Sequence, residues 1–231
     1  MEKEEKISQS QRFNLGYNNN LVSGWEGNVE AFYQSFTNLS YYSIIDNSDQ
    51  YYSLEASGGE GYNYGMELSL SKAWRNKSNL QLGYTWIKSE RQYENINNGN
   101  SFRADYGREH ELKIQFIFPY KKLLIGSQWT MASGFPFTIP NAVVHSNLLR
   151  NYNYISGKNN FSLPLYHRLD LSISRTLESK KGRKSIFSFN LFNAYNRFNA
   201  DHIIPDFPSK KIKKISNFGV VPSFYYKLYI K

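Results

Sequence analysis

The chain has 231 residues, 17% aromatic residues, no cysteine and a formal net charge of +9. No apolar run reaches the roughly 18 residues that a membrane-spanning helix needs, so that class of membrane protein is excluded. A mean hydropathy of −0.60 still allows a membrane-spanning β-barrel, because only every second residue of a barrel strand faces lipid.

Alternating apolar and polar residues predict nine β-strands and no amphipathic helix. Leu112, Ile114 and Phe116, for example, share one face of a strand, and the polar residues between them share the other. The same period of two is found, in chain order, in residues 11–22, 26–36, 62–74, 79–90, 107–118, 122–132, 166–176, 185–193 and 215–230, with Asn and Gly interrupting the first two.

The connections between these strands alternate in length. The short ones are 23–25, 75–78, 119–121 and 177–184, and the long ones are 37–61, 91–106, 133–165 and 194–214. Outer-membrane barrels have short periplasmic turns and long extracellular loops, with aromatic residues near the strand ends, as here. We therefore predict an all-β fold, about nine strands of a transmembrane antiparallel β-barrel in the Gram-negative outer membrane, with a periplasmic C-terminus.

Residues 1–10 are predicted to be a charged lead-in, and residues 11–231 the barrel part. The first six residues lack the apolar region of a signal peptide, which an outer-membrane protein needs for export. Nine is also an odd number of strands, whereas single-chain bacterial barrels have an even number. We expect the chain to be the C-terminal part of a longer protein whose export signal lies upstream.

Four stretches, taken together, resemble the C-terminal barrel half of TonB-dependent outer-membrane receptors of the Bacteroidota type. They are GYNYGME at 61–67, SGFPFTIP at 133–140, YHRLDLS at 166–172 and NLFNAYNR at 190–197. From the residues alone, Gly134 permits a turn and two prolines stiffen the exit into a long loop. The asparagines of 193–199 are expected where a strand breaks into a loop.

The resemblance implies a 22-stranded barrel closed by an N-terminal plug, with a carboxypeptidase-regulatory-like module further upstream. Such receptors take up a nutrient such as a glycan, peptide or siderophore, using energy transmitted through TonB. The plug and the TonB contact would belong to the missing N-terminal part. The other implied partners are outer-membrane lipid, lipopolysaccharide and a surface lipoprotein, and no cofactor is implied.

The sequence departs from the family pattern at two places. Of an Asp-Arg-Arg-His-like run that the family commonly shows, this chain keeps Arg108 and His110 but has Gly107 and Glu109 in the other positions. The chain also ends on Ile230 and Lys231, whereas barrel assembly signals usually end on an aromatic residue. We therefore assign no family role to the first cluster as a whole, and we expect a weaker assembly signal than usual.

Candidate site residues fall into two groups. The polar residues Glu67, Arg168 and Asp170 are predicted to face the lumen, where Arg168 and Asp170, two residues apart on one strand, suit a wall-stabilising ion pair or a plug contact better than a ligand site. Aromatic rings and arginines in the long loops could stack on sugars or aromatic siderophores and pair with carboxylates. These predicted ligand-binding residues are Tyr41, Tyr42, Tyr51, Tyr52, Arg103, Tyr106, Arg108, Phe135, Phe137 and Tyr152.

Other functions are less well supported by the sequence. The alternative is a small stand-alone outer-membrane barrel acting as a hydrolase or adhesin, but the four histidines (His110, His145, His167 and His202) have no metal-ligand spacing, and we predict no catalytic or metal site. The lysines of 210–214 and 180–184 could attract phosphates, yet no nucleic-acid-binding module is recognisable. Lipopolysaccharide phosphates are the better-placed target for lysines in an outer loop.

Overall fold

The computed structural model describes residues 7–47, 50–139, 142–145, 151–154, 157–179, 183–206 and 211–229. Nearly all of its regular structure is β-strand, and its helical parts are the single turns η1 (Val22–Gly24) and η2 (Asn97–Gly99). Among the described residues, no helix is long and apolar enough to cross a membrane.

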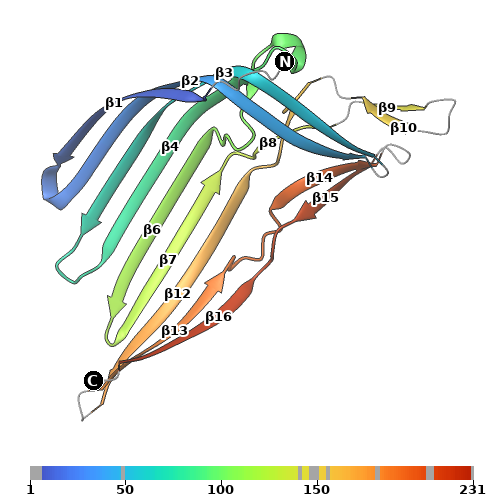
Figure 1. Cartoon of the computed structure of the whole chain (residues 1–231). Coiled ribbons are helices and arrows are strands. Elements are labelled where there is room, and N and C mark those ends of the chain that lie inside the picture. The colour runs from blue at the N-terminus through green and yellow to red at the C-terminus, as the bar shows by residue number, and fades with distance from the viewer. Residues whose placement is uncertain are drawn as a thin grey trace.

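One antiparallel sheet forms the body of the molecule (Figure 1). Nine long strands pair side by side in this sheet, in the order in which they occur in the sequence. Their order is β1 (Gln9–Asn20), β2 (Trp25–Asn47), β3 (Gln50–Ala73), β4 (Asn79–Gln92), β6 (His110–Tyr120), β7 (Leu123–Ala132), β12 (Tyr166–Glu178), β13 (Lys184–Phe192) and β16 (Val221–Tyr229). A short strand, β5 (Phe102–Arg103), pairs with β4. The predicted all-β fold with nine antiparallel strands is confirmed.

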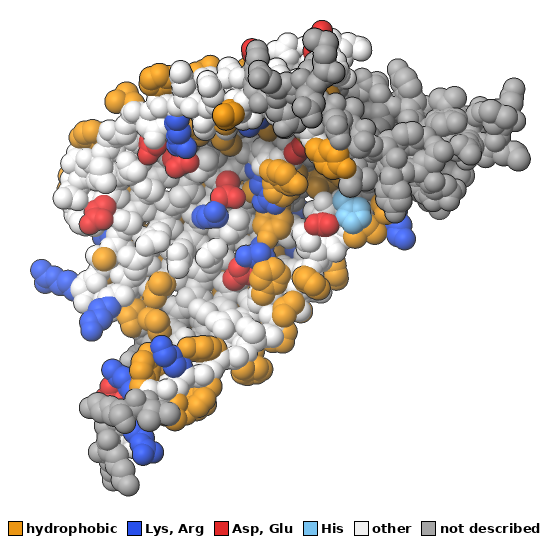
Figure 2. Space-filling view, viewed as in Figure 1, with side chains coloured by type: hydrophobic (Ala, Val, Ile, Leu, Met, Phe, Trp, Pro, Cys, Tyr) orange, Lys and Arg blue, Asp and Glu red, His pale blue; other side chains and the backbone are white. Residues whose placement is uncertain are grey.

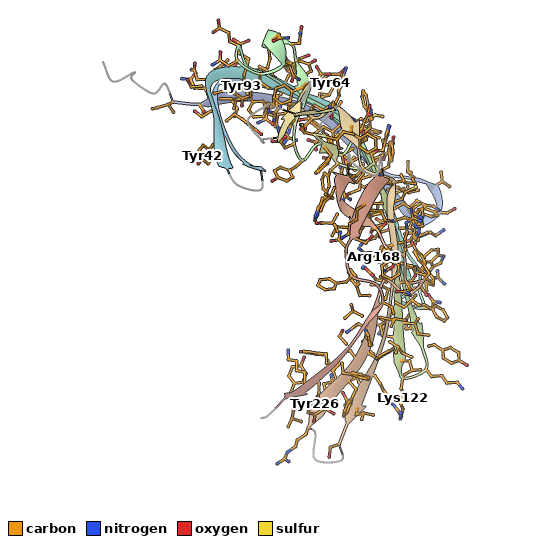
Figure 3. All side chains as sticks on the ribbon, turned by 90° about the vertical axis from the view of Figure 1, so that its right-hand side faces the viewer. Tyr42, Tyr64, Tyr93, Lys122, Arg168 and Tyr226 are labelled. Carbon is orange, nitrogen blue, oxygen red and sulfur yellow. The ribbon has the colours of Figure 1, made fainter. Side chains whose placement is uncertain are left out.

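Short and long connections lie at opposite ends of the sheet, which we call the turn end and the loop end (Figure 1). Figure 3 places Lys122 and Tyr226 at the turn end and Tyr42 and Tyr93 at the loop end. The last strand finishes at the turn end, because Tyr229 is paired with Lys184 at the start of β13. The predicted alternation of connection lengths is therefore confirmed for three of the four long connections, 91–106, 133–165 and 194–214.

The prediction was wrong about the first long connection, 37–61. Most of it is strand: β2 continues to Asn47 and β3 begins at Gln50, forming a long hairpin that projects from the loop end (Figure 1). The pairing register shifts between Phe36 and Leu39 and again between Leu39 and Tyr41. A bulge changes the face on which the following residues lie, so the period of two is interrupted here and the sequence pattern no longer resembles a strand.

Three small hairpins lie within the other long connections. They are β8 (Pro136–Phe137) with β11 (Phe161–Ser162), β9 (Ala142–His145) with β10 (Asn151–Tyr154), and β14 (Ala200–Asp206) with β15 (Lys211–Ser216). The predicted strand 215–230 therefore began too early, since its first residues belong to β15.

Gly134 does not serve the turn that the sequence predicted. It allows a close approach of two backbone segments, because a Cβ at this position would clash with the carbonyl of Leu163.

The sheet has one apolar face and one polar face, and the register keeps the two apart. Leu82, Ile114, Trp129 and Leu169 are directly paired across four strands, and the adjacent row pairs Gln81, Gln115, Gln128 and Asp170. Side chains of neighbouring rows point to opposite faces, so the rows belong to different faces throughout. The alternation predicted strand by strand is therefore in phase across the sheet.

The apolar face has no protein layer over it in the described part of the chain. On β1, Phe13, Leu15 and Tyr17 are 66%, 79% and 66% exposed. The opposite face is the one turned to the viewer in Figure 2, where few hydrophobic side chains are visible over the middle of the sheet and acidic and basic groups lie side by side. An extended apolar face of this kind is suited to hydrocarbon and not to water.

We predict that charge is tolerated on one face only. Ile114→Arg should lower the free energy of unfolding by roughly 2–4 kcal/mol, as expected for arginine at a bilayer midplane. The matched control Gln115→Arg adds the same charge to the adjacent position on the polar face and should cost much less. Refolding titrations of the full-length protein in lipid bilayers would measure both. Equal losses in the two variants would show that the faces are assigned wrongly.

Candidate functional site

The long connections pack against one another at the loop end. Tyr93, Ile96 and Phe102 of the 91–106 connection form a buried apolar cluster with Ala56 of β3. The Tyr93 ring stacks on Phe102 at 6.1 Å and contacts Tyr41 at 5.8 Å between ring centroids. This cluster fixes the 91–106 connection against the projecting β2–β3 hairpin.

Polar contacts attach the same connection to residues 157–162. The Arg103 guanidinium donates to Ser162 Oγ at 2.6 Å and to the carbonyl oxygens of Asn159 and Phe161 at 3.3 and 3.1 Å. In return, the buried Asn159 amide donates to the Arg103 carbonyl at 2.6 Å and to Asp105 Oδ1 at 2.9 Å. Arg103 is thus engaged in joining two loops.

Lys158 completes this junction. Its Nζ lies 2.7 Å from Asp105 Oδ1 and 4.8 Å from the centre of the Tyr41 ring. Burial lowers the pKa of Lys158, but its hydrogen bonds to Asp105 and Tyr41 outweigh burial and leave that pKa above its ordinary value. The ammonium group is therefore held charged in a largely buried position.

Beneath this loop layer lies a cavity that we call the outer hollow, with a volume of about 690 Å³. Its floor is the polar face at the outer part of β3 and β4, and its wall is formed by the loops. The lining residues that matter here are Tyr41, Arg91, Tyr106, Arg108 and Phe135. Four of these five are among the residues that the sequence predicted for ligand binding.

Arg108 is the most unusual group in the outer hollow. Its guanidinium carbon lies 4.0 Å from the centre of the Phe135 ring and 4.7 Å from that of Tyr166. Its buried Nε has no hydrogen-bond partner, and no carboxylate of the described residues lies within ion-pair distance. Burial lowers the pKa of Arg108. The Glu111 carboxylate lines the same hollow and interacts with Arg108 from beyond ion-pair distance. A cation held between two rings without an ion-pair partner can accept an anionic ligand.

On the polar face, Arg168 and Asp170 form the predicted ion pair. Arg168 Nη2 lies 2.8 Å from Asp170 Oδ2, and Arg168 Nη1 donates to the Tyr166 hydroxyl at 2.9 Å. The other oxygen, Asp170 Oδ1, accepts from the backbone N–H of Asn193 at 2.9 Å. The pair therefore joins β12 to the point where β13 ends.

Asn193 explains the asparagine-rich stretch that follows β13. Its side chain is only 1% exposed and donates to the carbonyls of Arg197 and Phe218 at 2.9 and 3.2 Å, while Arg197 N–H donates to its Oδ1. Its φ of 54° lies in the left-handed region, which asparagine tolerates better than most residues. Asn199 similarly bonds both backbone groups of His167.

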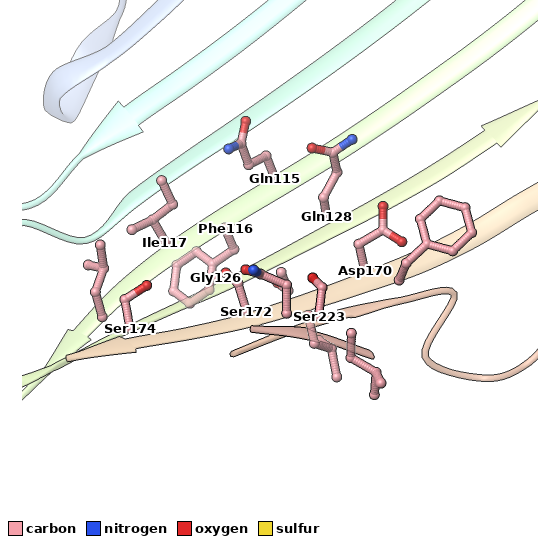
Figure 4. A pocket seen from close by; sticks show the side chains of 15 residues that line it. Gln115, Phe116, Ile117, Gly126, Gln128, Asp170, Ser172, Ser174 and Ser223 are labelled. Atoms are coloured by element: carbon pink, nitrogen blue, oxygen red, sulfur yellow. The ribbon is translucent and has the colours of Figure 1, made fainter. Parts of the chain in front are cut away.

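A second, shallower cavity of about 360 Å³ lies on the polar face nearer the turn end (Figure 4). Gln115, Gln128 and Asp170 project along one side of this wall hollow. Its base is made of small residues, among them Gly126, Ser172 and Ser174. Small side chains leave room for another protein segment to approach the strands closely.

A family model described as "TonB dependent receptor-like, beta-barrel" matches residues 8–196, which is most of the chain. The chain belongs to this family. The resemblance found in the four sequence stretches is thereby confirmed, and members of this receptor family reside in the outer membrane.

Solved structures agree with this TonB-dependent receptor barrel fold. The outer membrane transporter YddB from Escherichia coli aligns with a TM-score of 0.65 at 13% identity, over 97% of this chain and 32% of that one. BauA, the ferric preacinetobactin receptor from Acinetobacter baumannii, aligns with a TM-score of 0.55 at 15% identity, over 96% of this chain and 29% of that one. The chain thus spans about a third of these receptors. A search of curated proteins found no match.

The structure gathers some of the predicted ligand residues of this receptor barrel and separates others. Tyr41, Tyr106, Arg108 and Phe135 line the outer hollow, whereas Arg103 is engaged in the loop junction, Tyr42 is 61% exposed on β2, and Phe137 pairs with Phe161 in a small hairpin. The side chains of Tyr51, Tyr52 and Tyr152 lie outside the described part. Their role in binding stays a prediction, as does the lumenal position of Glu67, Arg168 and Asp170.

Sequence reasoning missed Arg91 and Lys158. Arg91 was placed at the start of a loop, but it lies at the end of β4, where its guanidinium donates to Asn63 Oδ1 at 3.0 Å and covers the Phe36 ring. Strict alternation would have placed it with Ser89 on the polar face. Lys158 had no signal, because its partner Asp105 lies 53 residues away in the chain.

The histidine rings have tyrosine or aspartate neighbours. Within the described residues, His110 Nδ1 lies 2.8 Å from the Tyr84 hydroxyl, His167 Nδ1 lies 2.7 Å from that of Tyr195, and His202 Nδ1 lies 3.0 Å from Asp201. The side chain of His145 lies outside them. Of these three contacts, none brings a serine hydroxyl to the imidazole, as nucleophilic catalysis would require.

We predict that the buried Asn193 amide stabilises the wall. Asn193→Ala removes three hydrogen bonds and should lower the free energy of unfolding by roughly 1–3 kcal/mol, because two carbonyls and one N–H lose their partner. Asn217→Ala, which changes an exposed asparagine in the same loop region, should shift it by less than about 0.5 kcal/mol. Bilayer refolding titrations of both variants provide the comparison. Similar values for the two would contradict the role given to Asn193.

Proposed function

We propose that residues 11–231 form part of the wall of an outer-membrane receptor that imports a nutrient with energy supplied through TonB. The polar face, with Glu67, Arg168 and Asp170, would line the lumen, and the turn end would lie in the periplasm together with the C-terminus. Family membership and the separation of the two faces support this arrangement.

The plug would come from a part of the protein outside this chain. In the described residues, β1 and β16 are each paired on one side only. Strand edges cannot remain unpaired in hydrocarbon, so further strands must close the wall. We infer that the wall hollow, with its base of glycine and serine, receives a segment of the plug, and that TonB acts through this plug and not through the chain described here.

The observation that carries the proposed cargo class is the unpaired Arg108 cation. It lies between two rings in a cavity that opens on the polar face beneath the long loops. Such a site suits an acidic cargo with a face that can stack on an aromatic ring. An acidic siderophore with an aromatic ring, an acidic peptide with an aromatic residue, or a sugar acid stacked through its C–H face satisfies both demands.

Uptake measurements on cells test the proposal. Strains with and without the gene would be given a panel of labelled siderophores, acidic peptides and sugar acids. At least one compound should enter only when the gene is present and the inner membrane is energised. If uptake of every compound is unaffected by gene deletion or by a protonophore, the import function is contradicted.

Variants of Arg108 test the cargo class separately. Arg108→Met should weaken binding of the imported compound roughly tenfold to a hundredfold, since a hydrogen-bonded charge contributes about 1.5–3 kcal/mol. Arg108→Lys keeps the charge and should retain part of the affinity. Heat-modifiability on gels would show that both variants fold. Unchanged affinity in Arg108→Met would contradict an anionic contact at this residue while leaving import itself intact.

A further inference from the structure

The turn end of the sheet carries an excess of positive charge that the import mechanism does not use. We call this set the basic rim. Among the described residues it contains Lys72, Arg75, Lys77, Lys121, Lys122, Arg175, Arg183, Lys184 and Lys227, against the acidic residues Glu26 and Glu178. Figure 2 shows basic side chains along this edge of the molecule, and Figure 3 places Lys122 there.

Most cations of the rim have no carboxylate partner in the described part of the chain. Only Lys184 has a carboxylate within ion-pair distance in the described residues, at 3.2 Å from Glu178. Several cations of the polar face and the loops do have such a partner: Arg168, Lys113 and Lys158 each contact an acidic side chain. Unpaired, clustered cations create a potential that attracts anions.

Several of these cations lie directly at the border of the apolar face. The Lys72 Nζ lies 5.0 Å from the centre of the Trp25 ring and 5.4 Å from that of Trp74, and the two indoles meet edge to face at 6.4 Å. Lys121 lies 5.3 Å from the Tyr120 ring. Arg175 is paired with Leu123 and Phe187, both residues of the apolar face.

This arrangement is suited to the headgroup level of a bilayer. Indole and phenol rings favour the interface between hydrocarbon and water, and a lysine beside them can keep its stem in the apolar layer while its ammonium reaches the phosphates. A nucleic acid or another soluble polyanion would gain nothing from the adjacent apolar face. The geometry therefore favours a lipid surface.

We propose that the basic rim binds the phosphate groups of anionic glycerophospholipids, with the Lys72 ammonium between Trp25 and Trp74 as its best-formed contact. The inference rests on the proposed function only in that the sheet spans a bilayer with its turn end at a phospholipid leaflet. It does not depend on the cargo or on TonB. Anionic lipid at this rim would fix the depth and tilt of the wall.

Native mass spectrometry of the full-length protein in detergent can test this site. The probes are dioleoyl phosphatidylglycerol, dioleoyl phosphatidylcholine and free glycerol 3-phosphate. The double variant Lys72→Gln, Lys121→Gln removes two rim charges, and the matched control Lys213→Gln, Lys214→Gln removes two charges from β15 at the loop end. The variant Lys72→Arg, Lys121→Arg keeps the rim charge.

We expect the wild type to bind phosphatidylglycerol more tightly than phosphatidylcholine, and glycerol 3-phosphate at the same concentration not to displace it. The glutamine rim variant should lose roughly thirtyfold in affinity, because it removes two basic residues and each of them contributes about 1 kcal/mol near an anionic surface. The control and the arginine variant should keep the wild-type affinity.

Three results would overturn the proposal: equal affinity for the two lipids, equal losses in the rim and control variants, or displacement by glycerol 3-phosphate, which would indicate a site for a soluble phosphate. If the glutamine rim variant gives no heat-modifiable band, it has not folded. The proposal is then tested by the affinities of the wild type and the arginine variant for the two lipids. Because no cargo is present, this result is separate from the uptake result, and failure of one does not imply failure of the other.

Discussion

The rest of the structure depends on one constraint: where strands cross hydrocarbon, every backbone N–H and C=O must find its partner in the sheet while the side chains on one face remain apolar. The paired rows that contain Leu82 and Ile114 on one face, and Gln81 and Gln115 on the other, satisfy both demands together. A shift of one residue in β4 or β6 would place glutamine in lipid, so the hydrophobic free energy fixes both the register and the face. The lipid-facing chemistry of the wall and the polar chemistry of the site both follow from this.

The site is built where that constraint ends. Beyond the membrane, the β2–β3 hairpin can contain bulges, and the loops are held by ordinary packing and hydrogen bonds, as in a soluble protein. The junction of Arg103, Asn159 and Lys158 positions the loop layer, and Arg108 is left without an ion-pair partner beneath it. At the opposite end, the turns are too short to form such a layer, and their charges lie beside the aromatic residues that border the apolar face.

The sequence predicted the wall well and the loops poorly, for a physical reason. The alternation around Ile114 depends on a local property, the polarity of the medium on each face of the sheet. It can therefore be recognised in the sequence of a single strand. The extension of β2 beyond Phe36 was missed because a bulge interrupts that alternation, and the start of β16 was misplaced because β15 has an apolar content of its own. The link between Lys158 and Asp105 depends on loop folding, which leaves no periodic signal in the sequence.

The central claim is that the sheet is a bilayer-spanning wall whose long loops lie outside the cell and whose short turns lie in the periplasm. The chain has no cysteine, so in a full-length protein whose other cysteines are replaced, one introduced cysteine per variant reports one position. Asn98→Cys, in the second long connection, and Lys77→Cys, in the β3–β4 turn, both replace exposed residues. On intact cells that make the full-length protein, an impermeant maleimide should label Asn98→Cys at once and Lys77→Cys only after the outer membrane is permeabilised. Equal labelling of both variants on intact cells, or the reverse order, would contradict the account.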